Sequence, residues 1–179
     1  MTVLDQDTVD YYRSWLDYRR WFLRVPGVQV AIAERGVPVL SAAFGSANLD
    51  TGEPLTEQHR FRIASHSKSF AAVAVLQLLE QGRLRLDDPL GERVPELADS
   101  PVAAVTVGEL LSHGGGVIRD SEDGDFWQGW RDFPDRDGLL AIAIDTSAAV
   151  IDRNDRFKYS NIGYGLLALV LEAVGGASF

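Results

Sequence analysis

The segment HSKSFAAVAVLQLLEQ, residues 66–81, constrains the fold of this chain more than any other segment. It is rich in alanine and leucine, stops at Gly82, and predicts a helix with apolar side chains on almost every face. A helix of this kind is usually buried on all sides, because none of its faces suits water. Other elements must therefore pack around it, and the 179 residues are enough for one well-buried core.

The N-terminal part of the chain predicts a helix followed by two strands. Residues 8–24 carry apolar side chains at helical spacing and indicate an amphipathic helix. Residues 28–34 and 37–47 have the composition of β-strands. Arg35-Gly36 between them has the length and the glycine of a tight turn, so the strands are expected to form a hairpin.

The pattern changes from strands to helices after a polar loop expected over 48–59. Thr106 and Glu109 have the spacing of a capping box, which predicts the start of a short helix. Two further helices are expected over 137–146 and 162–174, the second of them apolar on most faces.

This change gives the domain division. Residues 1–60 are expected to form the N-terminal helix and two strands of an α/β part, and residues 61–179 a helical subdomain. Within the second part, Pro89 and Pro95 predict an irregular stretch.

Composition excludes several kinds of partner. The net charge of −9 argues against nucleic acid or an anionic membrane surface. The chain has no cysteine, which rules out disulfides, a thiol nucleophile and cysteine-based zinc sites. No run approaches the length of a membrane span. Residues 1–10 lack the basic start and apolar stretch of a secretory signal, so a cytoplasmic location is expected.

Ser65 and Lys68 stand three residues apart at the start of the expected helix. At this spacing two side chains share a face, with β-carbons roughly 5–6 Å apart. Free N–H groups at a helix N-terminus favour developing negative charge on a serine there. A lysine removed from water loses affinity for its proton, and its neutral amine can then accept the serine proton as general base.

The alternative for this pair is coincidence. Given the serines of the chain, an S-x-x-K match arises by chance in about one such sequence in eight. The only lysines are Lys68 and Lys158, however, and a lysine buried without a partner or a function is costly.

Tyr159-Ser160-Asn161 precedes the last expected helix. A phenol that faces a cationic lysine has its ionised form stabilised and can relay protons. The alternative is that Ser160 or Asn161 simply caps the helix.

Other candidates have plainer explanations. His113 is expected to be structural and His59 to lie on a loop surface, and no pair of histidines has metal-ligand spacing, so neither a metal nor another cofactor is expected. The aromatic residues of the loop over 120–134 either line a substrate pocket or pack the loop onto the helical part: Phe126, Trp127, Trp130 and Phe133.

Three stretches together resemble the β-lactamase-related serine hydrolases, which include penicillin-binding proteins, D-alanyl-D-alanine carboxypeptidases and esterases. FRIASHSKSFAAVAVLQLLEQGRLRLDDPL, residues 61–90, is similar to the family segment that carries the S-x-x-K nucleophile. VTVGELLSHGGG, residues 105–116, resembles its L-L-S-H helix, and FKYSNIGYGLLALVLEAVGG, residues 157–176, its Y-x-N element. The order and spacing match from about residue 26 onward.

The resemblance implies a β-lactamase/transpeptidase-like fold, in which an antiparallel sheet part accompanies a mainly helical subdomain. It also implies site roles. Ser65 would be acylated, Lys68 would activate it, and Tyr159 would shuttle the proton and activate the deacylating water. Asn161 would bind a substrate carbonyl or the Lys68 amine, and the Ser65 N–H would supply half of the oxyanion hole.

The family's third motif, K-T-G or H-x-G on a strand, does not follow Tyr159, and later strands that complete the sheet are missing. We therefore expect a fragment or one piece of a split protein, with weak or no turnover alone and with a second chain as a partner that supplies the strands. The expected substrate is a small ester, amide, peptide or β-lactam, with an esterase or D-amino-acid peptidase favoured over a dedicated β-lactamase. The alternative is a non-catalytic binding or regulatory module.

Overall fold

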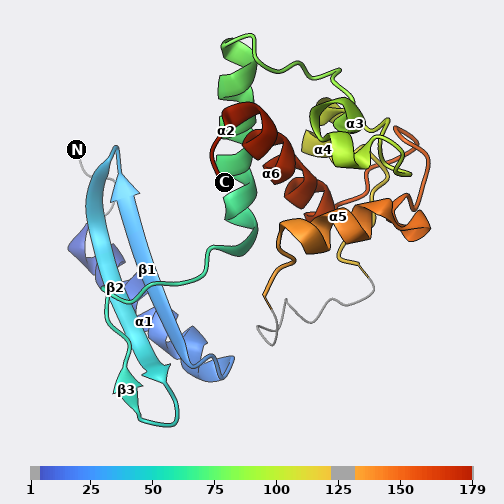
Figure 1. Ribbon diagram of the computed structural model, residues 1–179. Helices are drawn as coiled ribbons and strands as arrows, with labels where there is room; N and C mark the ends of the chain where they lie inside the picture. Colours follow the sequence, from blue (N-terminus) through green and yellow to red (C-terminus); the bar gives the residue numbers. More distant parts are fainter. Residues whose placement is uncertain (1–4, 122–131, 179) are drawn as a thin grey trace. The chain divides into compact units, whose positions relative to one another are not determined.

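The computed structural model describes residues 5–121 and 132–178 (Figure 1). Contacts divide the chain into two compact units, Met1–Arg62 and Ile63–Phe179. We call them the sheet unit and the helical unit and describe each by itself.

The sheet unit contains α1 (Gln6–Phe22), β1 (Gly27–Glu34), β2 (Val37–Asn48) and β3 (Glu53–Pro54). Asp5 caps α1, because its carboxylate accepts a hydrogen bond from the Thr8 N–H at 2.8 Å. The strands β1 and β2 pair antiparallel around Arg35 and Gly36, whose φ angles of 49° and 81° fit a tight hairpin turn. The predicted hairpin is therefore confirmed.

The prediction that 48–59 is only a loop is wrong at β3. This strand pairs antiparallel with β2 and extends the sheet to the order β1-β2-β3. Two residues are too few to show the alternation that marks a strand, so the sequence gives no sign of it.

The sheet unit has a small core. Its buried apolar side chains are Val9, Leu40 and Ala42, with Val30, Ile32 and Phe44 packed against them. The aromatic side chains of α1 are largely exposed and contact one another instead; the Tyr18 and Phe22 rings, for example, stack at 6.0 Å.

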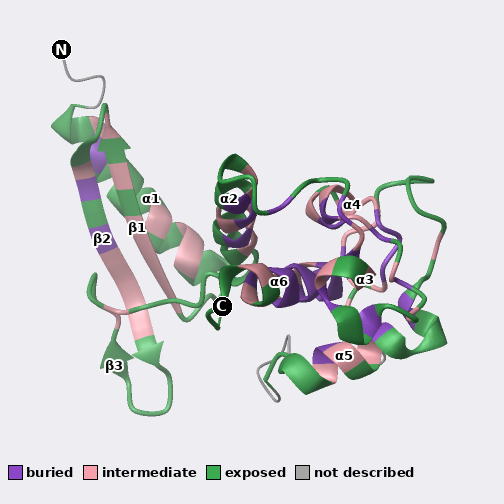
Figure 2. Cartoon of the chain, turned by 45° about the horizontal axis from the view of Figure 1, so that its top comes forward, coloured by how far each residue is buried: buried purple, intermediate pink, exposed green. Residues whose placement is uncertain are grey.

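The helical unit is built around α6 (Asn161–Gly175), which is buried along most of its length (Figure 2). Against it pack α2 (Ser67–Glu80), which follows the short turn η1 (Ala64–His66), and the helices α3 (Leu90–Arg93), α4 (Val107–Leu111) and α5 (Arg136–Ile144). The short turns η2 (Pro95–Leu97) and η4 (Thr146–Ala148) contact α5.

Within the helical unit, the apolar helix over 66–81 is not buried on all sides, contrary to the expectation. α2 buries one face against the core through Ala71, Val75 and Leu78. A second apolar row on the same helix is exposed; it consists of Phe70 at 68%, Val73 at 55% and Leu76 at 48%, and we call it the apolar stripe of α2.

The irregular stretch predicted around the prolines contains α3 and η2. Both elements are too short to show a helical period in the sequence, and Pro95 stands in the first turn of η2. The capping box, in contrast, is confirmed. The Thr106 hydroxyl accepts from the Glu109 N–H at 3.3 Å, and the Glu109 carboxylate accepts from the Thr106 N–H at 2.8 Å.

Among the described residues, no helix combines the length and the apolar character that crossing a membrane requires.

Candidate active site

Ser65 lies in η1, directly before the first turn of α2. The turn depends on Ala64, whose φ of 45° is unusual for a residue with a β-carbon and costs about 1–2 kcal/mol. The His66 N–H donates to the Ile63 carbonyl at 3.1 Å and closes the turn. Ser65 is exposed and stands at the end of α2 where backbone N–H groups are free of helix partners.

Lys68 stands in the first turn of α2 and is half-buried, less than the sequence led us to expect. Its ammonium donates to the Asn161 Oδ1 at 2.5 Å and to the Ser65 Oγ at 3.4 Å. The Nζ also lies 4.9 Å from the ring centroid of Tyr159 and 5.6 Å from that of Tyr164, so two aromatic faces stabilise its charge.

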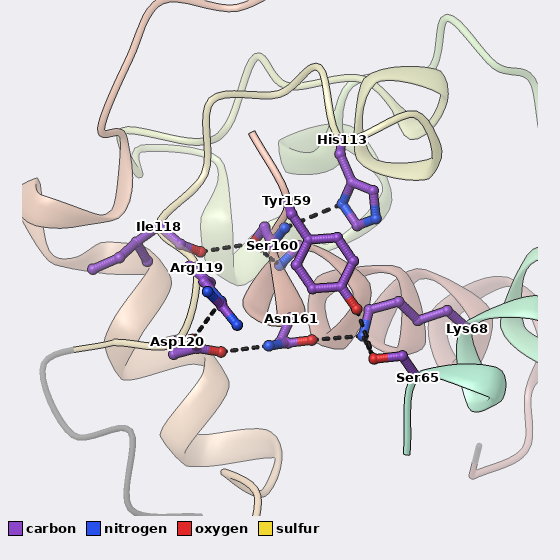
Figure 3. A network of polar contacts seen from close by, with 10 residues as sticks. Ser65, Lys68, His113, Ile118, Arg119, Asp120, Tyr159, Ser160 and Asn161 are labelled. Atoms are coloured by element: carbon purple, nitrogen blue, oxygen red, sulfur yellow. Dashed lines mark hydrogen bonds and ion pairs between the residues drawn. The ribbon is translucent and has the colours of Figure 1, made fainter. Parts of the chain in front are cut away.

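Tyr159 places its hydroxyl 2.7 Å from the Ser65 Oγ (Figure 3). Burial would raise the pKa of this phenol. Hydrogen bonds with Lys68 and Ser65, together with the positive charges of Lys68 and Arg119, outweigh burial and lower the pKa below its usual value. The ionised phenolate is therefore more accessible than in an isolated tyrosine.

The start of α6 fixes Asn161. Ser160 caps the helix, since its hydroxyl accepts from the Gly163 N–H at 2.7 Å and donates to the Ile118 carbonyl at 2.6 Å. The capping alternative thus holds for Ser160, whereas the Asn161 carboxamide is 4% exposed and turns toward Lys68.

His113 packs against the ring of Tyr159. Its Nδ1 accepts from the Ser160 N–H at 3.2 Å, and its ring centroid lies 4.5 Å from that of Tyr159. Burial and the positive charge of Lys68 lower the pKa of His113, so the neutral ring is favoured. These contacts fit the structural role expected for this histidine.

The structure brings the four predicted site residues, Ser65, Lys68, Tyr159 and Asn161, into one polar cluster within the helical unit (Figure 3). Sequence reasoning missed Asp120. This residue accepts a short hydrogen bond from the Asn161 Nδ2, and no motif in the sequence marks it.

The other candidates lie elsewhere. His59 is in the sheet unit, where its Nδ1 accepts from the Thr56 N–H at 3.0 Å. Phe126, Trp127 and Trp130 fall outside the described residues, while Phe133 packs beside Gly165 of α6. Within residues 5–121 and 132–178, no group of three or more His, Asp or Glu side chains is arranged to hold a metal ion.

Chemically, the cluster joins a hydroxyl, an acidified phenol and an amine by short contacts. A serine becomes a useful nucleophile when a group within about 2.6–3.2 Å can take its proton. The Tyr159 oxygen satisfies this distance, and the Lys68 charge lies beside it.

The chain has the β-lactamase/transpeptidase-like fold, in which a mainly helical unit accompanies an antiparallel sheet. The chain belongs to the Beta-lactamase family, whose family model matches residues 18–179.

Individual relatives agree with this assignment. Protein flp of Staphylococcus aureus is 27% identical over 87% of this chain and 31% of its own length. The solved structure of an octameric penicillin-binding protein homologue from Pyrococcus abyssi is 32% identical, with a TM-score of 0.80 over 95% of this chain and 40% of that one. D-amino acid amidase from Ochrobactrum anthropi SV3 is 26% identical, also with a TM-score of 0.80, over 94% of this chain and 45% of that chain. The chain spans about a third of the length of the curated relatives it matches.

Proposed function

We propose that this chain carries the nucleophile of a serine hydrolase that forms an acyl-enzyme on Ser65 and cleaves an ester, amide or β-lactam bond. The observation that carries the proposal is the 2.7 Å contact between the Ser65 Oγ and the Tyr159 hydroxyl, beside the Lys68 ammonium. Membership of the Beta-lactamase family supports the same chemistry.

In the acylation step, the Ser65 Oγ attacks the substrate carbonyl carbon and its proton passes to the Tyr159 phenolate. The Lys68 ammonium stabilises that phenolate before the transfer. The Ser65 N–H donates to the oxyanion of the tetrahedral intermediate. The intermediate collapses when Tyr159 returns the proton to the leaving alkoxide or amine, which leaves an ester on Ser65.

Deacylation repeats the sequence with water. Tyr159, again ionised, takes a proton from the attacking water, and the second intermediate collapses when Tyr159 protonates the departing Ser65 oxygen. The 3.4 Å distance from the Lys68 Nζ to the Ser65 Oγ is longer than the tyrosine contact. We therefore assign Lys68 to activating Ser65 through the charge it sets beside Tyr159, with Asn161 holding its Nζ.

For the substrate, we favour a small ester or a D-amino-acid amide or peptide. The likeness to D-amino acid amidase supports the amide class.

The apolar stripe of α2 supports a partner. Phe70, Val73 and Leu76 are exposed on a helix whose opposite face lies in the core. Contiguous apolar surface of this kind is typical of a contact surface. We propose that a further polypeptide segment, which includes strands and which a second chain can supply, covers this stripe and completes the site.

The test is intact-mass analysis after incubation with a fluorophosphonate, an activated ester or a penicillin. We expect one adduct on the wild-type chain, mapped to Ser65. Ser65→Ala should abolish it, whereas Ser67→Ala, a matched change two residues along the same helix end, should retain it. The absence of any adduct on the wild type, also after a C-terminal strand segment is supplied, would favour the alternative of a binding module. An adduct that persists in Ser65→Ala would contradict the assignment of the nucleophile.

A further inference from the structure

We propose that Asp120 is a positioning residue that fixes the Asn161 carboxamide with its oxygen toward Lys68. The inference deepens the proposed function and rests on it for its catalytic meaning. Its structural content can be tested on its own.

The contacts of Asp120 reach two neighbours. One carboxylate oxygen accepts from the Asn161 Nδ2, and the other pairs with the Arg119 Nε at 2.9 Å (Figure 3). The Asp120 side chain is 16% exposed and that of Arg119 is 60% exposed. An ion pair with so exposed an arginine contributes little by itself, so the bond to the buried Asn161 gives Asp120 its importance.

The chemistry of a carboxamide explains what this bond decides. Asn161 has one end that accepts and one end that donates, whereas a carboxylate only accepts and an ammonium only donates. Asp120 can therefore bind only the Nδ2 end, which leaves the Oδ1 end for the Lys68 Nζ at 2.5 Å. The flipped carboxamide would set two donors against each other at Lys68 and two acceptors against each other at Asp120.

The consequence is a series of hydrogen bonds, each with a fixed donor and acceptor, that links Asp120 to Ser65 through Asn161 and Lys68. The same carboxylate holds Arg119, whose guanidinium carbon lies 5.9 Å from the Tyr159 ring centroid. Within the described part of the chain, Asp120 forms no hydrogen bond with Ser65 or Tyr159; its contacts are with Asn161 and Arg119. Its effect on the reaction must therefore pass through Asn161 and Arg119.

A direct test is NMR of the chain labelled with ¹⁵N-asparagine. The asparagines are Asn48, Asn154 and Asn161, so the side-chain amides give few signals and two internal references. In Asp120→Ala, we expect the Asn161 amide signals to shift and their exchange with water to rise roughly 10- to 100-fold, because a bond to a charged acceptor is lost. The signals of Asn48 and Asn154 should stay unchanged. Arg119→Ala is the matched control, because it removes the ion pair but leaves the bond to Asn161.

A reciprocal exchange separates positioning from general folding. Asn161→Asp alone places two carboxylates against each other, and Asp120→Asn alone lets either carboxamide turn. The double variant Asp120→Asn/Asn161→Asp again pairs one donor end with one carboxylate, and a carboxylate oxygen still faces Lys68. We expect fluorophosphonate labelling of Ser65 to be roughly tenfold or more slower in Asp120→Ala than in the wild type. The double variant should be labelled faster than either Asp120→Asn or Asn161→Asp alone. Because the charge moves closer to Lys68, the pH profile of the double variant should differ from that of the wild type.

Unchanged Asn161 signals in Asp120→Ala would overturn the inference, and so would a double variant no faster than the single ones. If the wild type is not labelled even with the C-terminal strand segment supplied, the proposed function fails, and the NMR result alone decides whether Asp120 orients Asn161.

Discussion

The sheet unit and the helical unit bury their apolar side chains to very different extents. Among the described residues, the sheet unit keeps a small core at Val9, Leu40 and Ala42, and α1 exposes most of its aromatic rings. The core of the helical unit extends through α2, α4, α5 and α6. A large core holds its elements in place, whereas a small one permits local opening at low free energy.

The polar cluster lies in the better-packed unit. Asn161 begins α6, whose following side chains are almost all buried, and Ser160 is 3% exposed. Groups on rigid elements keep reactive distances within tenths of an ångström, which catalysis needs. The difference between the units therefore shows where this chain keeps its geometry fixed.

The largest effect is expected from Gly116→Ala in the helical unit. Gly116 has a φ of 67°, and a β-carbon there would clash with the backbone carbonyl of Ile151. We expect the free energy of unfolding to fall by more than about 3 kcal/mol and the amides of α6 to lose hydrogen-exchange protection. Gly36→Ala, at a φ of 81° with open space around it, is the control and should cost about 1–2 kcal/mol. Equal losses in the two variants would show that the carbonyl contact is unimportant.

Next come matched truncations in the two cores. Leu167 of α6 is fully buried and Leu40 of β2 is 3% exposed. We expect Leu167→Ala to cost about 3–5 kcal/mol, because the surrounding core cannot close the cavity, and Leu40→Ala about 2–3 kcal/mol, because its small core can relax. Chemical denaturation monitored by hydrogen-exchange mass spectrometry measures the loss of stability in each unit separately. A larger loss for Leu40→Ala would reverse the comparison.

A smaller effect is expected from pH, through His113. The folded state lowers the pKa of this ring, so as the pH falls the unfolded chain takes up its proton first. The contribution to stability is therefore present above the ordinary histidine pKa of about 6.5 and is lost as the pH falls through the lower folded value. Protection of the α6 amides should decline over this window in the wild type and in His59→Gln. It should decline less in His113→Asn, and an identical decline there would assign the effect to other groups.

The smallest effect is expected from Phe70→Ser on the apolar stripe of α2. At 68% exposure, Phe70 makes few contacts with the described residues, so the free energy of unfolding should change by less than about 0.5 kcal/mol. The same change should weaken binding of any segment that covers the stripe. A loss of about 2 kcal/mol in the isolated chain would mean that the stripe is already covered.

The elements that could be predicted from the sequence are those whose signal is local. The turn at Arg35-Gly36 and the capping box at Thr106 and Glu109 depend on residues close together in the chain, and both are present. β3 and α3 were missed because two to four residues are too short to show a period. The exposure of the apolar stripe of α2 was not predicted. Composition shows that a helix face is apolar, but it does not show whether another segment covers that face.

The site divides in the same way. Motif spacing and family resemblance pointed to Ser65, Lys68, Tyr159 and Asn161. In the structure Ser65 contacts Tyr159 and Lys68, and Lys68 also binds Asn161. Their roles remain proposals. Asp120 was not predicted, because its importance comes from a contact across 41 positions and not from any neighbour in the sequence.

The most direct test of the central claim is the rate at which a fluorophosphonate modifies Ser65 in the wild type and in Tyr159→Phe. If Tyr159 takes the serine proton, the variant should react on the order of 100-fold more slowly. The wild-type rate should rise with pH and level off below the ordinary tyrosine pKa of about 10, because the folded state lowers the pKa of Tyr159. Equal rates in the two proteins, with the adduct still on Ser65, would contradict the account and assign the proton to another group.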